Sequence, residues 1–262
     1  MPRTIPGRAP VSKGAGPLTR ATASRLRDQR IGAGEPIASR SPKASEPFQG
    51  AAVNEPLVFL DVDTQVDFMC LSGSLYVPSA EAIVPNLERL MTYARRRGIP
   101  VISSADAHPP DDPSFAKWPP HCVVGTPGQR RIPETQFPTA SVVPNRLGAF
   151  VPPGAGWAGQ TIVEKQEYDV STNVNFPAIL ESLGHRRWVV FGVATEYCVQ
   201  SSALALRKRG LPVDLVIDAI KPITEEGGRK ALRELTAAGV RQVSTEMVCV
   251  SSILVNPRHR DG

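Results

Sequence analysis

The sequence predicts an α/β fold built on a doubly wound parallel sheet. Short apolar runs rich in β-branched residues recur along the chain, and most alternate with segments of helical periodicity. Several of the strand-like runs end at polar clusters, and most connections between elements are short. This alternation favours right-handed crossovers that place helices on both faces of a parallel sheet.

The expected strands cover residues 57–60, 100–104, 161–165, 187–191, 212–217 and 240–245. A weaker strand pattern occurs at Ala140–Val143, inside a Pro- and Gly-rich connection that runs from Pro109 to about Gly159. Connections of this length without regular structure are usually functional in compact domains. We therefore expect the 109–159 connection to take part in the function.

Helical patterns separate most of these strands. The first has an apolar face of Leu87, Leu90, Met91 and Ala94, with Pro85 in its first turn and Gly98 as its stop. Further helices are expected over 177–183, after Cys198, and over 225–238, and Gly184 and Gly239 mark two of their ends.

The basic charge of the chain is concentrated at its N-terminus. Residues 1–50 carry nine Lys and Arg against three Asp and Glu, a net +6 against +5 for all 262 residues, so the remainder is nearly neutral at −1. This region is rich in Pro, Gly, Ser and Thr and lacks periodicity, which predicts a disordered extension over residues 1–53. An organelle transit peptide is the alternative. We expect one domain over residues 54–250, a tail over 251–262, and no nucleic-acid partner.

Cysteine usage and hydropathy are typical of a cytoplasmic protein. The four cysteines show neither a disulfide framework nor a paired metal motif. No apolar run reaches the roughly 18 residues that a membrane helix needs, and the first 50 residues lack the apolar segment of a secretory signal. We therefore expect no membrane partner, and we leave the formation of a homo-oligomer open.

The most informative stretch runs from Val189 to Leu206. An apolar run reaches Gly192, a short polar turn follows, and a helical pattern begins, so Cys198 lies where a buried strand leads into a helix. The N–H groups of such a turn lack intrahelical partners and can stabilise a thiolate and an oxyanion. A free cysteine is also often a small buried apolar side chain. The stretch alone leaves both interpretations open.

Two other strands end at residues that could act with this thiol. Asp63 follows the first strand and Lys165 ends the 161–165 strand. Because parallel strands have their carboxyl ends at one edge of the sheet, we expect the carboxylate, the ammonium and the thiol to meet there. A base and a positive charge are what a cysteine nucleophile needs. From spacing alone, Asp63 could instead be a turn residue and Lys165 a solvated surface group.

Several motifs occur in a specific order along the chain. They are Asp63-Thr64-Gln65-Val66-Asp67-Phe68, Asp106-Ala107-His108, Trp118-Pro119-Pro120-His121-Cys122, Gly125-Thr126-Pro127-Gly128, Lys165, and Gly192-Val193-Ala194-Thr195-Glu196-Tyr197-Cys198-Val199. Together they resemble the isochorismatase-like cysteine hydrolases, and within that superfamily the nicotinamidase/pyrazinamidase branch, over about residues 55–250. The resemblance implies a Rossmann-like fold with a six-stranded parallel sheet, which agrees with the six expected strands.

The resemblance also implies an amidase that converts nicotinamide to nicotinate and ammonia. Asp63 is the implied general base, Lys165 stabilises the charged pair, and Cys198 attacks the amide carbonyl to form a thioester that water hydrolyses. The implied oxyanion hole consists of the N–H groups of Ala194 and Cys198, with a cis peptide bond before Ala194.

A metal site and a ring-binding site are implied as well. Asp106, His108 and His121 match the metal ligands of the family, and the set suits Zn²⁺ first, with Fe²⁺ or Mn²⁺ as alternatives. Phe68 and Trp118 match positions that sandwich the substrate ring. Without the resemblance, an Asp-x-His turn could be an ordinary polar loop and the two aromatic residues could be core residues.

Some features depart from the nicotinamidase pattern, and they leave other functions open. Ala107 stands where an aromatic residue is usual, the Tyr168–Phe176 segment resembles general cysteine hydrolases, and the Gln129–Gly159 connection is long. The alternatives are a carbamoyl or other small-amide hydrolase, an isochorismatase acting on a vinyl ether, and a binding protein without activity. Gly154–Gly159 matches a dinucleotide motif, but no strand precedes it, so we expect no nucleotide cofactor.

Overall fold

The computed structural model describes residues 55–152 and 159–250. The predicted extension over 1–53, the predicted tail over 251–262 and most of the glycine motif at Gly154–Gly159 lie outside the described residues. None of the helices in the described part of the chain has the length and apolar character required to cross a membrane.

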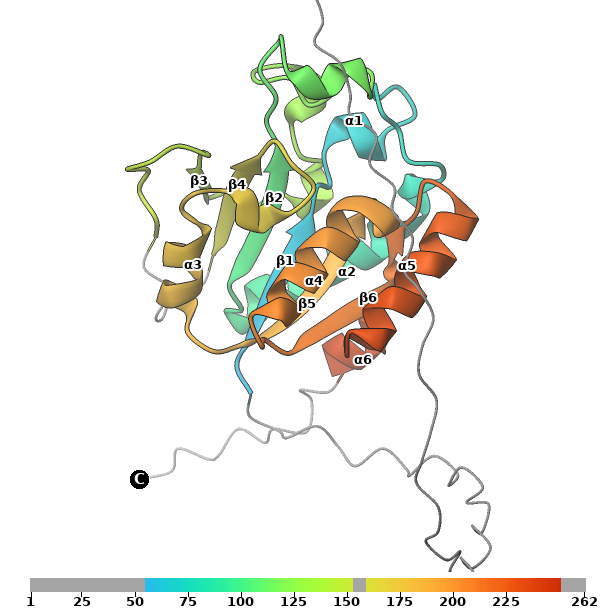
Figure 1. The fold of residues 1–262 in the computed structure, drawn as a ribbon. Helices are drawn as coiled ribbons and strands as arrows, with labels where there is room; N and C mark the ends of the chain where they lie inside the picture. Colours follow the sequence, from blue (N-terminus) through green and yellow to red (C-terminus); the bar gives the residue numbers. More distant parts are fainter. Residues whose placement is uncertain (1–54, 153–158, 251–262) are drawn as a thin grey trace, which may run out of the picture. The chain divides into compact units, whose positions relative to one another are not determined.

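The strands of the described residues form one parallel sheet in the order β3-β4-β2-β1-β5-β6-β7 (Figure 1). They are β1 (Leu57–Val62), β2 (Val101–Asp106), β3 (Ala140–Val143), β4 (Gln160–Lys165), β5 (Arg187–Val193), β6 (Val213–Lys221) and β7 (Arg241–Val243). The expected parallel sheet is confirmed, but it has seven strands and not six.

The additional strand is β3, the weaker candidate from the sequence. It lies at the edge of the sheet and pairs in parallel with β4, with Val143 opposite Val163. Only Val143 is fully buried in this strand, and Val142 is half exposed. The apolar signal of β3 is therefore weak because a short edge strand buries little of its side-chain surface.

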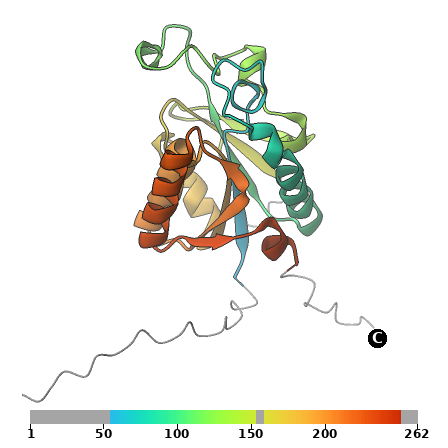
Figure 2. The same cartoon turned by 90° about the vertical axis from the view of Figure 1, so that its right-hand side faces the viewer.

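Helices cover both faces of the sheet, as expected. The core on one face involves α3 (Phe176–Leu183), α4 (Gln200–Lys208) and α5 (Glu225–Ala237), and the core on the other involves α2 (Val84–Arg97). Figure 2 shows the orange and orange-red helices α4 and α5 on one side of the sheet and the teal α2 on the other. The short α6 (Thr245–Val250) packs beside α2 and was not predicted, because the last strand ends two residues earlier than expected.

The ends of α2 follow from local sequence chemistry. Pro85 lies in its first turn, where a missing N–H costs no helical hydrogen bond. Gly98 ends the helix with a φ of 64°, a left-handed conformation that glycine adopts without a steric penalty. Leu87, Leu90 and Ala94 are fully buried, so one apolar face of α2 packs on the sheet.

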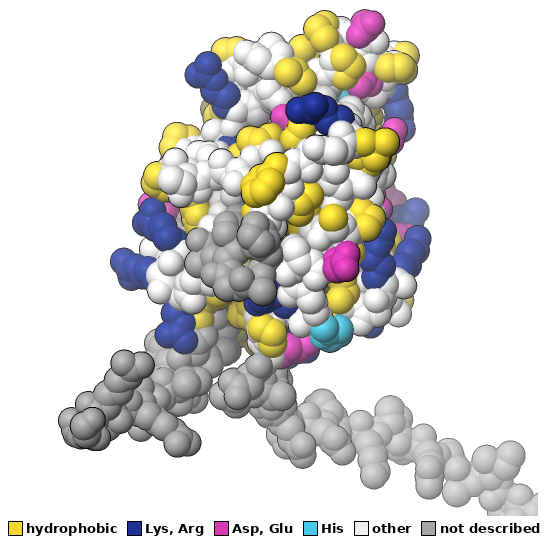
Figure 3. Space-filling view, turned by 90° about the vertical axis from the view of Figure 1, so that its left-hand side faces the viewer, with side chains coloured by type: hydrophobic (Ala, Val, Ile, Leu, Met, Phe, Trp, Pro, Cys, Tyr) yellow, Lys and Arg dark blue, Asp and Glu magenta, His cyan; other side chains and the backbone are white. Residues whose placement is uncertain are grey.

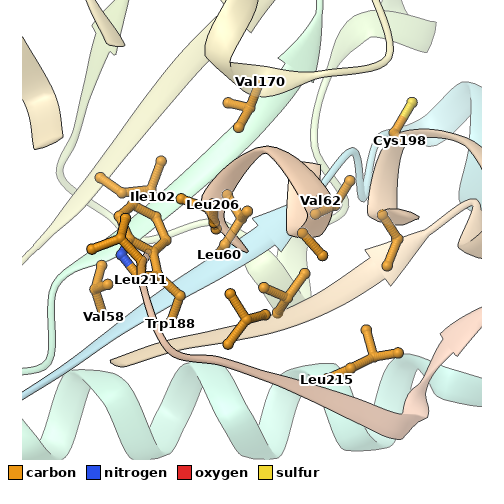
Figure 4. Close-up of a cluster of buried hydrophobic side chains, with 14 of the residues drawn as sticks. Val58, Leu60, Val62, Ile102, Val170, Trp188, Cys198, Leu206, Leu211 and Leu215 are labelled. Carbon is orange, nitrogen blue, oxygen red and sulfur yellow. The ribbon is translucent and has the colours of Figure 1, made fainter. Parts of the chain in front are cut away.

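The core on the α3–α5 face leads towards the carboxyl ends of the strands. Val58, Leu60 and Val62 from β1 pack with Trp188 from β5 in this core. Figure 4 shows these side chains, with Cys198 at one end of the cluster. The densely packed sheet therefore provides a rigid base for residues that follow β1 and β5.

The long connection between β2 and β4 is not structureless. Besides β3 it contains three single turns of 3-10 helix, η2 (Pro113–Ala116), η3 (Pro127–Gln129) and η4 (Pro133–Thr135). In Figure 1 much of this green segment, together with α1 (Val66–Met69), lies above the carboxyl ends of the strands. The connection is therefore placed to cover a site at that edge of the sheet.

The surface on the β3 side of the molecule is mixed in character. Figure 3 shows hydrophobic side chains on this face lying among charged and polar groups. Exposed apolar residues of the described chain include Val142, Leu147, Phe150 and Val174. Scattered exposed apolar side chains are ordinary on protein surfaces.

Candidate active site

Four adjacent strands each deliver one functional side chain to the same edge of the sheet. Lys165 ends β4, Asp106 ends β2, and Asp63 directly follows β1. Cys198 lies in η6 (Thr195–Val199), a single π-helical turn between β5 and α4. All four residues are buried. The convergence expected from parallel strand ends is therefore present in the structure.

The Lys165 ammonium lies at the centre of this group. Its Nζ atom is 2.8 Å from Asp63 Oδ2 and 3.6 Å from Cys198 Sγ, and it also donates to Asp106 Oδ1. Reactive atoms of Asp63, Asp106 and Cys198 all lie within 4.8 Å of one another. One buried cation thus pairs with two carboxylates and contacts the thiol.

Burial changes the proton affinities of these groups. It raises the pKa of the Cys198 thiol well above 9.0, against the attraction of Lys165. It also raises the pKa of Asp63 above 3.8, again opposed by Lys165. Burial alone would lower the pKa of Lys165, but the carboxylates of Asp106 and Asp63 hold it well above 10.5. The lysine is therefore charged, the thiol carries a proton, and Asp63 is a stronger base than a solvated aspartate.

The turn that holds Cys198 is held by its own hydrogen bonds and by contacts with one other loop. The Val193–Ala194 peptide bond before it is cis, and the Ala194 carbonyl accepts hydrogen bonds from the N–H groups of Tyr197 and Val199. The Glu196 carboxylate accepts from the N–H groups of Ile223 and Thr224, at 3.1 and 2.9 Å, just before α5. This glutamate therefore connects the turn to the loop between β6 and α5.

Asp106, His108 and His121 form a cluster with the donors of a metal site. The Nε2 atoms of His108 and His121 lie 3.6 and 3.7 Å from Asp106 Oδ2. Ligand atoms at about 2.0–2.1 Å from a tetrahedral zinc ion are themselves about 3.3 Å apart. The spacing of the three donors is thus close to that of a metal-binding set.

The surroundings of the two imidazoles fit the same interpretation. His108 Nδ1 bonds Asp112 Oδ2 at 2.9 Å, and His121 Nδ1 bonds the Pro119 carbonyl at 2.8 Å. These contacts direct both Nε2 atoms towards Asp106, and the buried Nε2 of His108 has no hydrogen-bond partner among the described residues. Imidazoles that bind metals are usually oriented in this way through their second nitrogen. The residues present therefore fit a divalent ion.

A largely apolar cleft opens onto the thiol. It encloses about 410 Å³ of space between its lining residues, a figure that includes its solvent-open mouth. Asp63, Asp106, His121, Ala194 and Cys198 form its polar end. Its remaining lining residues are Phe68, Leu75, Val77, Trp118, Tyr168, Val193, Tyr197 and Ile223. The two aromatic residues predicted to contact a substrate ring both line this cleft.

Three aromatic side chains form one wall of the cleft. Trp118 Nε1 donates to the hydroxyl of Tyr168 at 3.0 Å, and the Tyr197 ring lies 5.5 Å from Trp118 and 5.4 Å from Tyr168 between centroids. Tyr168 belongs to the segment that departs from the nicotinamidase pattern. Neither Tyr168 nor Tyr197 had a predicted role, although Tyr197 lies in the motif that contains Cys198.

Comparison with known proteins agrees with this geometry. Residues 57–247 match the isochorismatase domain family. The chain belongs to the isochorismatase family. It is 31% identical over 204 residues to a nicotinamidase of Escherichia coli strain K12, an alignment that covers 70% of this chain and 92% of the relative. The family match therefore covers nearly all of the described domain.

Solved structures of family members resemble the fold closely. The pyrazinamidase of Pyrococcus horikoshii in complex with zinc has a TM-score of 0.60 at 29% identity and covers 72% of this chain and 98% of its own. PnC1 from L. infantum in complex with nicotinate has a TM-score of 0.61 at 25% identity, with coverages of 73% and 94%. The structural likeness thus extends over nearly the whole of both relatives.

A buried polar network beside the site was not anticipated. The Arg131 guanidinium is paired with the Asp61 carboxylate, and both side chains are almost fully buried. Asp61 also accepts from the hydroxyls of Thr64 at 3.0 Å and Ser103 at 3.1 Å. An aspartate within the apolar run of β1 was a signal for such a network. Nothing in the sequence identified Arg131 as its partner.

Gln65 links the end of β2, which carries Asp106, to the long connection. Its side chain accepts from the Asp106 N–H at 2.7 Å and donates to the carbonyls of Asp106 and Gln129 at 2.9 and 2.8 Å. The residue lay inside the first motif of the sequence but had no assigned role. It holds the end of β2 against the segment that covers the site.

Proposed function

We propose that the protein is a nicotinamidase-like amidohydrolase that converts nicotinamide to nicotinate and ammonia. One observation carries the proposal: a buried lysine joins a carboxylate to a thiol at the end of an apolar cleft, beside a cluster with metal-site donors. The family membership and the nicotinamidase relatives support the same activity. The roles of individual residues below are part of this proposal.

Asp63 and Cys198 perform the covalent chemistry. Asp63 accepts the thiol proton as the sulfur attacks the amide carbonyl, and the resulting carboxylic acid then protonates the departing nitrogen, so ammonia leaves a thioester behind. Asp63 next takes a proton from water, whose oxygen attacks the thioester and releases the carboxylic acid product. The thiol recovers its proton in that step.

Lys165 and the backbone of the turn stabilise charge during both steps. The high pKa of Lys165 keeps the ammonium charged next to Asp63 and Cys198, where it favours the thiolate as it forms. Ala194 and Cys198 line the cleft, and their N–H groups are the proposed donors to the oxyanion. These groups need no rearrangement because the turn is fixed by its own hydrogen bonds.

Asp106, His108 and His121 are the proposed ligands of a divalent ion, and zinc is the ion that we favour. When bound, such an ion supplies a Lewis acid at the polar end of the cleft that can hold a ring nitrogen and orient the amide. Both imidazoles would bind the ion through Nε2, and the contacts of their Nδ1 atoms hold them in the required tautomer.

The cleft favours a neutral aromatic amide over a substrate with a carboxylate. Its lining residues include two aspartates but no lysine or arginine that could pair with a second acidic group. Phe68 and Trp118 provide flat apolar surfaces for a planar ring. An N-carbamoyl amino acid or isochorismate, each of which bears carboxylate, would bring its charge beside these aspartates. Another small neutral amide remains the alternative substrate.

We place this chemistry within residues 54–250 and in a cytoplasmic setting. The four cysteines are free thiols, and a reducing compartment keeps thiols in this state. Every residue named in the proposed mechanism lies within this range.

Ammonia release from a substrate panel tests the function. Nicotinamide and pyrazinamide should be hydrolysed with kcat/KM values well above those of aliphatic amides, ureas and N-carbamoyl amino acids. Pre-treatment with a chelator should reduce turnover, and added Zn²⁺ should restore it. A preference for any carboxylate-bearing substrate would overturn the assignment of the cleft.

A further inference from the structure

Ser104 lies in β2, fully buried, and contacts the proposed general base twice. Its Oγ donates to Asp63 Oδ1 at 2.6 Å. Its carbonyl accepts from the Asp63 N–H at 3.3 Å. Both contacts come from one residue in a regular strand, which is paired with β1 on one side and with β4 on the other.

These contacts determine the orientation of the Asp63 carboxylate. Ser104 holds Oδ1, and Lys165 lies 2.8 Å from Oδ2. Because Ser104 holds one oxygen and Lys165 contacts the other, the orientation of the Asp63 carboxylate is set. Oδ2 is the oxygen next to Lys165. Asp63 also has a φ of 49°, a conformation uncommon for residues other than glycine, which persists where surrounding contacts support it.

Arg131 also holds the backbone of Ser104 in place. Its Nη1 donates to the Ser104 carbonyl at 3.0 Å, so that oxygen receives both Arg131 and the Asp63 N–H. Arg131 is itself held by Asp61 in the buried network. The backbone of Ser104 is therefore fixed by a charged group that does not enter the cleft.

We propose that Ser104 is a positioning residue that orients Asp63 towards the Cys198 thiol. The hydroxyl acts through Asp63, because Ser104 is fully buried and is not among the residues that line the cleft. This inference rests on the proposed function, in which Asp63 moves the protons. Its physical basis is that proton transfer requires the base to be held within hydrogen-bond reach in the correct orientation.

The neighbouring Ser103 provides a matched control. It lies in the same strand and is equally buried, but its hydroxyl donates to Asp61 Oδ2 and not to Asp63. Ser104→Ala should lower kcat for nicotinamide about 10- to 100-fold with KM changed less than about twofold, because orientation at the reacting atoms is lost and ring binding is not. Ser103→Ala should retain kcat within about threefold.

Three further measurements separate positioning from a general loss of structure. Ser104→Thr keeps the hydroxyl and should recover most of the lost kcat, and bound zinc per chain should be equal in all variants. A crystal structure of Ser104→Ala should show the Asp63 carboxylate rotated or in two conformers. If wild-type protein hydrolyses nicotinamide but Ser104→Ala and Ser103→Ala have equal kcat, the inference is wrong. If wild-type protein hydrolyses no amide, the proposed function fails instead.

Discussion

Replacing Lys165 with methionine should destabilise the metal-free protein and stop turnover. Lys165 is fully buried and pairs with the carboxylates of Asp63 and Asp106. Without it, two carboxylates with oxygens within 4.8 Å of each other are left without a cation. At an effective dielectric constant of about 20, two charges at that separation repel by about 3.5 kcal/mol. This agrees with the roughly 3–5 kcal/mol measured when one partner of a buried ion pair is removed.

The loss of stability should depend on pH in a defined direction. Burial tends to raise the pKa of Asp106, but Lys165 and the hydrogen bonds from His108 and His121 together outweigh it and hold the folded-state pKa below 3.8. A carboxyl of this kind stabilises the fold above its unfolded pKa, and the contribution disappears as pH falls through the folded value. In the variant the carboxylates can take up protons on acidification. The difference between wild type and Lys165→Met should therefore be largest near pH 7 and shrink below about pH 4.

Urea unfolding followed by circular dichroism, after treatment with a chelator, measures this difference. In a domain of this size, 3.5 kcal/mol corresponds to a fall in Tm of about 7–14 °C. Lys208→Met, at an exposed position near the end of α4, is the control and should change the free energy of unfolding by less than about 0.5 kcal/mol. A loss below about 1 kcal/mol for Lys165→Met at pH 7, or one that does not shrink in acid, would refute the reasoning.

Three other substitutions test separate parts of the site. Cys198→Ala should lower ammonia release by at least about 10³-fold at unchanged Tm, and appreciable turnover would remove it as the nucleophile. His121→Ala should lose bound metal by elemental analysis while His185→Ala, whose side chain is 68% exposed, retains it; equal stoichiometries would count against the ligand assignment. Arg131→Met should cost about 3–5 kcal/mol in urea unfolding because it leaves a buried carboxylate unpaired. Arg229→Met, in an exposed pair, should cost under about 0.5 kcal/mol, and similar losses for both would contradict the argument.

Much of the fold was predictable because its signals are local. The apolar face and Gly98 stop of α2 and the β-branched run of β5 each report their own structure within a few residues. The edge strand β3 and the terminal α6 were less visible, because each buries few side chains. Their formation depends on neighbours from elsewhere in the chain, which a local pattern does not record.

Part of the candidate site could likewise be predicted from the sequence, and part could not. The positions of Asp63, Lys165 and Cys198 could be anticipated, since the carboxyl ends of parallel strands share one edge. Their assignment to catalytic roles is still a prediction. Arg131 could not be found in this way, because its partner is brought to it only by the folding of the long connection. Ser104 was equally hidden, since a serine in a strand gives no sign of the side chain that it contacts.

Four neighbouring strands each supply one functional group, so the site can form only after these strands have assembled. Until β4, β2, β1 and β5 have all docked in register, the sulfur has neither its base nor its cation nearby. A nascent or partly assembled chain therefore carries an ordinary thiol and no hydrolytic competence. Recovery of turnover during refolding would consequently mark completion of the central sheet, the slow long-range event in a topology of this kind.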